Sequence, residues 1–364
     1  MQSLIQKKII DLFDGNEWQS QRRYLTRRGD RQPFMSASVI AILGRCRNLH
    51  PALTAQIDAC RTHLPRYQRG HLAYFWPVVN GMSRMPSAPV LSRFKLFAAD
   101  PDADTVCLQQ LALNQEQHYR KIAEELIYYR LDGSRFRPPH FQQKLPAMEN
   151  SFLTWFPPRL PAGQSRVESV DAGVDANILW FLGVTGQLEI PGTAETMKFL
   201  ETVVRSELIL SDPFRISMYY PFPAVLLYLI SRAVRWGKLR KLYSLKGKML
   251  ELIRSVQPDS AFDRLCLAGA AIYWEQQELA AGLAGNLLNR CDYPDAPIFV
   301  WPILSYFLMR APFPKWLVER SLFQMKFQCR ALQLSMQLYL LQQLERPGDQ
   351  TRRQSPALSF AKVK

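Results

Sequence analysis

Apolar residues recur every three or four positions in ten segments of this chain, whereas strict alternation of apolar and polar positions is rare. The first pattern indicates helices, and the second would indicate strands. We therefore expect an all-α fold. The predicted helices, separated by polar or proline-bearing connections, span residues 38–47, 104–113, 117–130, 175–184, 194–209, 223–236, 242–256, 262–281, 297–309 and 329–344.

A weak repeat relates three of these helices. In each of them an Asp is followed by Leu four residues later and by a small residue eight residues later. An Asp at a helix N-cap accepts hydrogen bonds from the unpaired N–H groups of the first turn, and it suits the positive end of the helix dipole. We therefore predict that Asp104, Asp175 and Asp263 are the N-caps of equivalent helices.

The apolar helices alternate along the chain with amphipathic ones, such as 117–130 and 198–209. This order predicts an inner and an outer helix layer, and repeated helical hairpins that close on themselves form an α/α toroid. An open solenoid is the structural alternative. We expect one domain over residues 1–345, in which 1–34 form a basic extension with a helix, and a disordered basic tail over 346–364.

The net charge of +15 is expected to attract anions. Because the basic residues are dispersed, a generally basic surface is the simpler interpretation. The segment QRRYLTRR, residues 21–28, mixes basic and aromatic side chains, and we interpret it as a solvated helix end. We predict no specific nucleic-acid partner. We expect peripheral contact with an anionic membrane, where hydrophobic substrates dissolve.

Three features indicate a cytoplasmic protein. Residues 1–18 show no signal-peptide pattern. The longest apolar stretches, 221–230 and 296–309, are shorter than the roughly 20 residues that span a bilayer. The six cysteines form no C-x-x-C pair, so we expect free thiols in a reducing compartment.

Alternating aspartates at Asp100, Asp102 and Asp104 invite several chemical interpretations. A calcium loop would need Gly at its sixth position and Glu at its twelfth, where this chain has Thr105 and Leu111. A phosphatase nucleophile of the D-x-D-x-[TV] type needs a fold of alternating strands and helices, which the pattern does not predict. A helix cap and a general acid in a helical cavity remain open.

The string DADTVCLQQLAL, residues 102–113, resembles the acid-motif region of class II terpene cyclases, in which D-x-D-D precedes Thr and an apolar helix. The string GVDANILWFLG, residues 173–183, resembles helix starts in the superfamily of terpene cyclases and protein prenyltransferases. The middle Asp of the acid motif falls on Ala103, so the motif is not intact. Only Asp104 and Thr105 carry over, and Asp102 is a shifted candidate.

The resemblance implies a helical toroid around a central cavity over residues 35–340. Protein prenyltransferases of this superfamily use a zinc site of Asp, Cys and His. The five histidines of this chain all lie within the first 140 residues, and nothing downstream supplies the ligand histidine. We therefore predict no metal and no cofactor.

Our leading hypothesis is an enzyme that acts on a hydrophobic small-molecule substrate, isoprenoid or polyketide-like, by carboxylate chemistry. The candidate catalytic residues are Asp104, Asp102 and Asp175, because an apolar cavity raises the pKa of a carboxyl group toward that of a useful acid. Aromatic π faces can stabilise a carbocation. The candidate substrate-binding residues are Trp76, Phe152, Trp155, Trp180, Tyr219 and Tyr220.

Two other functions fit the same pattern. One is a carbohydrate-active α/α barrel, in which two carboxylates about 5 to 10 Å apart would cleave a glycosidic bond. The other is a non-catalytic helical scaffold whose basic surface binds an anionic partner.

Overall fold

A computed structural model describes residues 1–345 of the chain, except 25, 31, 77, 80–81, 85–97, 144, 146–147, 303–315, 317–318 and 321–323. For residues 24, 26–28, 78–79, 82–84 and 98–99 it describes the backbone alone. The tail that we predicted to be disordered, 346–364, lies outside the described residues.

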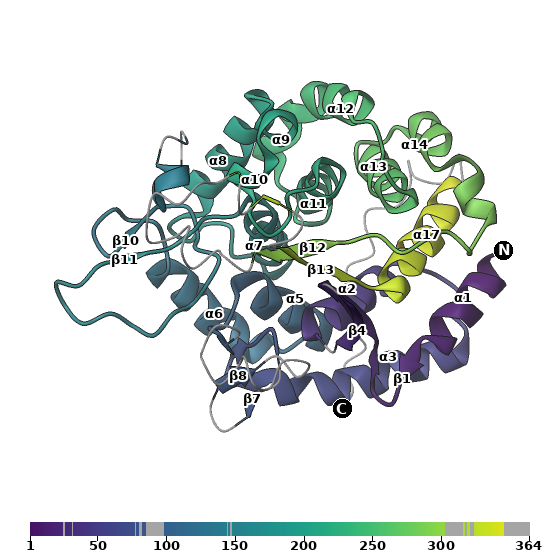
Figure 1. Ribbon diagram of the computed structural model, residues 1–364, viewed down its shortest axis with the longest axis horizontal. Helices are drawn as coiled ribbons and strands as arrows, with labels where there is room; N and C mark the ends of the chain where they lie inside the picture. The colour runs from purple at the N-terminus through teal and green to yellow at the C-terminus, as the bar shows by residue number, and fades with distance from the viewer. Residues whose placement is uncertain are drawn as a thin grey trace.

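Six helices that are buried on nearly every face form a ring (Figure 1). Each contacts the next, and the last contacts the first. In ring order they are α2 (Pro33–Leu43), α5 (Ala103–Leu113), α7 (Ala172–Thr185), α11 (Pro223–Trp236), α13 (Ala261–Tyr273) and α17 (Arg330–Leu344). The predicted all-α class is confirmed, and the contact between α17 and α2 supports a closed toroid over an open solenoid.

The amphipathic helices lie outside this ring (Figure 1). Helix α6, for example, buries Ile122, Ala123 and Leu126 and leaves most of its other residues partly or fully exposed. The outer helices are α1 (Gln2–Asp11), α3 (Pro51–His63), α6 (Glu116–Tyr128), α8 (Thr193–Arg205), α12 (Lys246–Ser255) and α14 (Gln277–Ala284). Shorter helical segments are α9 (Leu208–Ser211), α10 (Pro213–Ile216), η1 (Leu64–Tyr67), η2 (His140–Gln142), η3 (Arg240–Leu245) and η4 (Gly285–Asn289).

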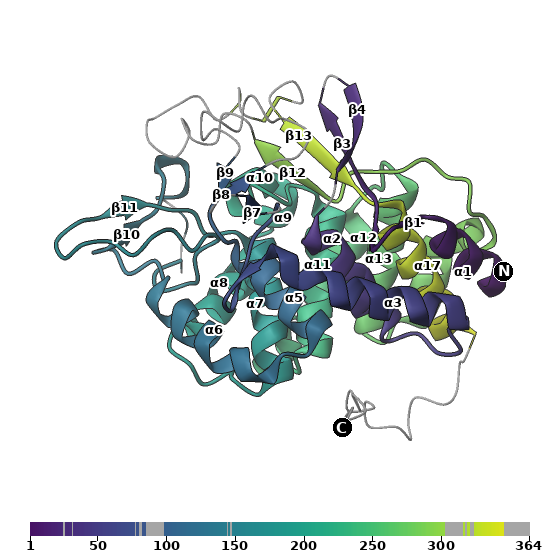
Figure 2. The same ribbon diagram turned by 90° about the horizontal axis from the view of Figure 1, so that it is seen from below.

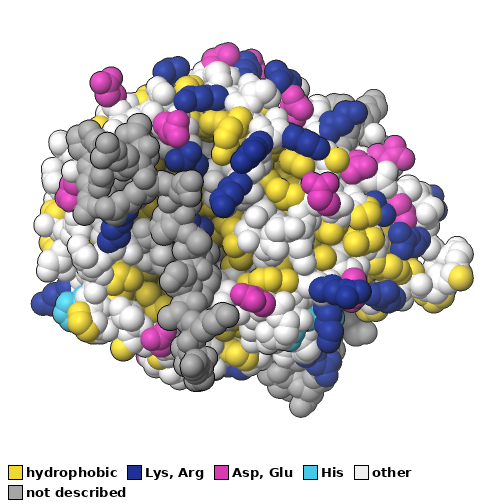
Figure 3. Space-filling model, turned by 180° about the vertical axis from the view of Figure 1, so that it is seen from behind, with side chains coloured by type: hydrophobic (Ala, Val, Ile, Leu, Met, Phe, Trp, Pro, Cys, Tyr) yellow, Lys and Arg dark blue, Asp and Glu magenta, His cyan; other side chains and the backbone are white. Residues whose placement is uncertain are grey.

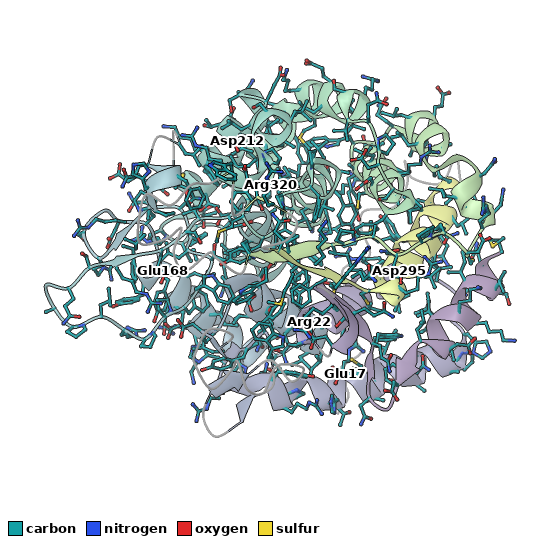
Figure 4. The ribbon with its side chains drawn as sticks, viewed as in Figure 1. Glu17, Arg22, Glu168, Asp212, Asp295 and Arg320 are labelled. Atoms are coloured by element: carbon teal, nitrogen blue, oxygen red, sulfur yellow. The ribbon has the colours of Figure 1, made fainter. Side chains whose placement is uncertain are left out.

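A four-stranded antiparallel sheet covers one end of the ring (Figures 1 and 2). Its order is β12 (Phe299–Pro302), β13 (Gln324–Gln328), β3 (Ser20–Tyr24) and β4 (Thr26–Asp30). Arg22, in β3, is buried and donates to the Met325 sulfur at 3.8 Å (Figure 4). The remaining short strands are β1 (Phe13–Asp14), β2 (Glu17–Trp18), β5 (Gln68–Arg69), β6 (Leu72–Ala73), β7 (Val78–Val79), β8 (Met82–Arg84), β9 (Ala98–Ala99), β10 (Phe136–Arg137) and β11 (Arg166–Val167).

The sheet corrects two predictions. Residues 21–28 are not a solvated helix end, because they form most of the β3–β4 hairpin. The predicted helix 297–309 is also wrong at its start, since 299–302 form β12 and 303–309 lie outside the described residues. Both segments also depend on a remote strand: β13 bonds to β12 on one side and to β3 on the other, although β3 pairs with the adjacent β4 as well. A pattern within one segment carries no information about such a partner.

Other helix boundaries also differ from the prediction. The expected helix 262–281 is interrupted after Tyr273, and Glu275 there adopts φ of 64°, a left-handed conformation that ends a helix. Helix α3 was not predicted, although Pro51 stands at its first position, where a proline is well tolerated. The helix predicted at 223–236 is confirmed at both ends.

The predicted N-caps are wrong by a few residues. The residues that cap these three helices are Asp102, Asp171 and Ser260. The aspartates expected there, Asp104, Asp175 and Asp263, lie inside the first turns at the second, fourth and third positions. The apolar repeat therefore fixes which residues face the core, but it does not fix where the extended backbone before each helix ends.

The six cysteines are free thiols, and five of them are buried. Among the described residues, no helix is long and apolar enough to cross a membrane.

Helices α7 and α11 approach each other through glycine. A Cβ added at Gly183 would lie 2.0 Å from the carbonyl oxygen of Gly237, which follows α11. Any side chain at position 183 would therefore separate the two helices.

Replacing Gly183 with Ala should lower the free energy of unfolding by about 3 kcal/mol, because the methyl group overlaps the Gly237 backbone. Urea denaturation measures this change. The control is Gly247→Ala in the exposed first turn of α12, where an added Cβ meets nothing within 4 Å. That variant should be unchanged, or more stable by up to about 1 kcal/mol. Equal stability of the two variants would contradict the close approach.

Candidate functional site

Two buried aspartates stand at the start of α5, beneath the sheet. Asp102 is 3% exposed and caps the helix, since its Oδ1 accepts from the Thr105 N–H at 2.8 Å. Asp104 is 4% exposed and lies in the first turn. The backbone beside Asp102 pairs with Trp155 in an isolated antiparallel bridge. The sequence around Trp155 is thereby held against the two carboxyl groups.

Asp104 stands two residues after Asp102, and the two carboxyl groups influence each other. Burial, followed by the neighbouring carboxyl group of Asp104, raises the pKa of Asp102 well above its usual value, although the Thr105 N–H lowers it. Two carboxylates this close cannot both be charged without a large penalty. Asp102 Oδ2 receives no donor from the described residues. Burial and the neighbouring carboxyl group therefore favour the protonated form of Asp102.

Asp104 is linked to two further helices of the ring. Its Oδ2 accepts from the Tyr220 hydroxyl and from Asn177 Nδ2, the latter at 3.2 Å. Asn177, in α7, in turn accepts a hydrogen bond from Arg232 of α11. Burial raises the pKa of Tyr220 well above its usual value, so the phenol remains a donor. The amide of Asn177 thus stands between a carboxyl group and a guanidinium.

Arg232 lies buried in this apolar surrounding. Its guanidinium stacks over Trp180 at 4.4 Å and over Tyr228 at 5.3 Å from the ring centroids. Such contacts stabilise a cation that has left water. Its Nε has no hydrogen-bond partner among the described residues. The charge of Arg232 is therefore balanced through Asn177 rather than by direct contact with a carboxylate.

Asp171 positions the segment that carries the two candidate tyrosines. Its carboxylate accepts from Ser217 Oγ at 2.6 Å and from the Tyr219 N–H at 3.0 Å, while also capping α7. Burial raises the pKa of Asp171 to about 6 in spite of these donors. The Tyr220 ring packs directly against the backbone of Gly173, because a Cβ at that position would lie 2.5 Å from the ring.

Aromatic side chains separate the carboxylates from the sheet. Trp155, Tyr219 and Trp301 pack together with centroids 5.4 to 6.1 Å apart and are only partly buried. Trp155 Nε1 donates to the Tyr219 hydroxyl at 2.9 Å. We call the connected set the aromatic layer: Phe34, Phe75, Trp76, Trp155, Tyr219, Tyr220, Phe299, Trp301 and Phe327.

An ion-pair group lies near this site. Arg166 bonds to Glu168 at 2.6 Å and to Asp100, the first of the alternating aspartates, at 3.4 Å. Figure 4 shows Glu168 on the side of β10 and β11. Asp100 is therefore engaged by Arg166, whereas Asp102 and Asp104 face the ring.

The structure brings most of the predicted site residues together. Tyr220 donates to Asp104, and Asp102 stands two residues before Asp104 at the start of the same helix. Trp76, Trp155 and Tyr219 belong to the aromatic layer.

Three predicted site residues lie elsewhere. Phe152 packs against Gly192, and its N–H bonds to Thr196 at the start of α8. Trp180 lies further along α7 and packs on Trp236. Asp175 is buried with neither carboxyl oxygen bonded by the described residues, and its pKa is raised well above the usual value by burial and then by Asp171. Asn177, not Asp175, links α7 to Asp104.

Four residues of the site were not predicted: Asp171, Asn177, Arg232 and Trp301. Asn177 and Arg232 could have been found, because each is a polar residue inside an otherwise apolar helix. A buried polar residue of this kind usually has a specific hydrogen-bond partner. Asp171 and Trp301 carried no comparable signal, since their partners lie in distant loops and strands.

Among the described residues, no group of three or more His, Cys, Asp or Glu side chains could hold a metal ion.

Comparisons with known proteins give a similarity in structure but not in sequence. No family model matches the sequence, and no curated protein matches it. The fold is similar to that of ent-copalyl diphosphate synthase from Streptomyces platensis, with a TM-score of 0.49 and 11% sequence identity. The match covers 86% of this chain and 50% of that enzyme, so the chain spans half of its length.

Replacing Asp175 with Asn should make stability less dependent on pH. Because burial raises the pKa of Asp175 in the folded protein, its proton must be retained on folding, and wild-type stability falls as pH rises above the ordinary Asp range. The advantage of Asp175→Asn should grow by up to about 1.4 kcal/mol per pH unit between pH 4 and 7. Urea titrations at several pH values measure it. Parallel stability curves would show that Asp175 is not buried as a neutral acid.

Proposed function

We propose that this protein is an acid-catalysed enzyme of the terpenoid-cyclase type, in which Asp102 protonates a carbon–carbon double bond of a hydrophobic, isoprenoid or polyketide-like substrate. One observation carries this proposal. A buried carboxyl group with a raised pKa and an oxygen that receives no donor stands beside a layer of aromatic rings.

The proton leaves Asp102 for one alkene carbon, and the π electrons of that double bond form the new C–H bond. The other alkene carbon becomes a cation, which a second double bond attacks to close a ring. The cyclised cation then loses a proton to water, which gives a neutral alkene, and water returns a proton to Asp102 before the next turnover. Asp102 is left as a carboxylate next to Asp104, where the Thr105 N–H stabilises it.

Asp104 acts as a positioning residue. Its hydrogen bonds to Tyr220 and Asn177 hold one carboxyl oxygen, which leaves the group in a fixed orientation toward Asp102. Our prediction that Asp175 is also catalytic remains open; Asp175 lies in the first turn of α7, and burial raises its pKa.

Aromatic faces suit the cation that this chemistry creates. Trp155, Tyr219 and Trp301 are the partly exposed members of the aromatic layer. Their π electrons stabilise a desolvated cation by about 2 kcal/mol or more per well-placed ring. Because the π face of a ring presents no localised lone pair, it stabilises the cation without trapping it as an adduct.

The carboxyl geometry argues against the carbohydrate alternative. Glycosidases hold their two carboxyl groups about 5 to 9.5 Å apart, so that a sugar carbon or a water fits between them. Asp102 and Asp104 instead stand two positions apart at the start of one helix, and each opposes the charge of the other. One neutral carboxyl group suits protonation of an alkene.

Asp102→Asn should abolish turnover, and Asp104→Asn and Tyr220→Phe should lower kcat at least about tenfold, as loss of a positioned acid or its orienting partner does. The assay incubates the protein with linear polyprenyl diphosphates and polyprene hydrocarbons in deuterated water. Products are analysed by gas chromatography and mass spectrometry.

Protonation by the enzyme should add one deuterium to each product. The matched control is Asp263→Asn, which lies in the first turn of another inner helix and whose side chain bonds Ser260; it should retain activity. Full activity of Asp102→Asn, or products without deuterium, would refute the mechanism.

We also propose that the outer face of the sheet contacts an anionic membrane surface. The register places Lys326, Arg23 and Arg27 side by side across β13, β3 and β4. Arg23 is exposed, and neither it nor Lys326 has an ion pair among the described residues. Adjacent like charges repel, so an anionic surface would relieve the repulsion.

Arg23→Glu combined with Lys326→Glu should reduce binding to vesicles that contain phosphatidylglycerol, because each lysine or arginine near such a surface contributes about 1 kcal/mol. Co-sedimentation at two salt concentrations measures it. The control, Lys241→Glu with Arg254→Glu, makes the same charge change on exposed outer residues of η3 and α12. Equal losses in both variants would mean that net charge alone drives binding.

A further inference from the structure

A second site lies at the other end of the ring from the carboxylates. The C-terminal parts of α2, α5 and α7, together with α3, surround a cavity of about 30 Å³. This is room for about two water-sized groups. The lining residues are Ile40, Ala41, Gly44, Arg45, Arg61, Leu111, Ala112, Trp180 and Val184.

The polar side chains that line this cavity are all hydrogen-bond donors. They are Arg45, Arg61 and Trp180, and no lining residue carries a carboxylate. Trp180 is 2% exposed, and its Nε1 has no hydrogen-bond partner among the described residues. A cavity that offers only donors is complementary to a ligand that offers only acceptors.

The two arginines are held in place by the protein. The guanidinium of Arg45 stacks over Trp236 at 4.9 Å and has no ion pair or side-chain hydrogen bond among the described residues. Arg61 donates from Nε to the Ala112 carbonyl at 3.0 Å and from Nη1 to Asp58 at 3.3 Å. One guanidinium is therefore fixed with a partner, and the other is fixed without one.

Electrostatics favour an anion at this position. Burial lowers the pKa of Arg45, which shows that its charge has lost hydration that no carboxylate replaces. Arg232 stacks on Trp180 and adds positive potential behind the cavity wall. The C-terminal ends of three helices would repel an anion by their dipoles. The attraction must therefore come from the guanidiniums.

We propose that this cavity receives two oxygen atoms of a phosphate group, either free or at the end of a phosphorylated ligand, and that the other oxygens face the solvent. Guanidinium forks match phosphate oxygens in charge and geometry. Gly44 at the rim is exposed, which leaves an approach from solvent. Figure 3 shows the face opposite the sheet, where Lys and Arg side chains lie among apolar ones. The proposal does not depend on the acid chemistry at the other end.

The test titrates inorganic phosphate and, separately, phosphatidic acid vesicles into the intact protein, by calorimetry and by tryptophan fluorescence. Arg45→Gln should weaken phosphate binding about tenfold, equivalent to about 1.4 kcal/mol. Trp180→Phe should remove the fluorescence change. The control is Arg47→Gln, an exposed arginine two residues away that removes the same charge.

Thermal denaturation of each variant shows whether it remains folded. Binding of inorganic phosphate that Arg45→Gln weakens more than Arg47→Gln supports a free phosphate as ligand. Binding of the vesicles alone, with the same difference between variants, supports a lipid head group. Absence of both, or equal weakening in the two variants, overturns the proposal.

Discussion

The hydrogen bonds that converge on Asp171 are the constraint on which the candidate site depends. This carboxylate caps α7 through the N–H groups of Gly173 and Val174, and it binds the segment that leads into α11 through Ser217 and Tyr219. Two elements that are separate in sequence therefore meet at fixed positions. Tyr219 then reaches Trp155, and Tyr220 reaches Asp104. The aromatic and acidic parts of the site share one anchor.

Burial of charge organises the interior of the ring. Burial and then the neighbouring Asp104 favour the protonated form of Asp102, while Asp104 and Arg232 are joined through the neutral amide of Asn177. A direct ion pair would neutralise both groups but would hold them rigidly together. The side chain of Asn177 lies between the two charged groups, so Asp104 stays next to Asp102 and Arg232 stays against the rings of Trp180 and Tyr228. The acidic and basic groups are thereby kept apart inside the ring of helices.

Apolar spacing was sufficient to predict the helical class, because burial of a helix depends on its own side chains. It also indicated Asp102 and Asp104, because both stand at the start of an apolar helix. It failed for Asp171, since Asp175 offered a better match to the repeat while the actual cap lies four residues earlier. It failed for Trp301 because β12 exists only through its partner β13. Such contacts are decided by the whole chain and are not encoded in any one window.

The contact between α17 and α2, which closes the ring, has a consequence for how the chain folds. Helix α17 packs between α1 and α2, and Gln2 bonds to Glu345 across 343 positions of sequence. Contacts between such distant segments form slowly, because the loop-closure entropy must be lost before they are gained. The helices that are synthesised before α17 would expose the apolar faces that pack against it until α17 joins the ring. Those faces belong to α1 and α2 at the start of the chain and to α13 near its end, so closure of the ring joins the two ends of the sequence.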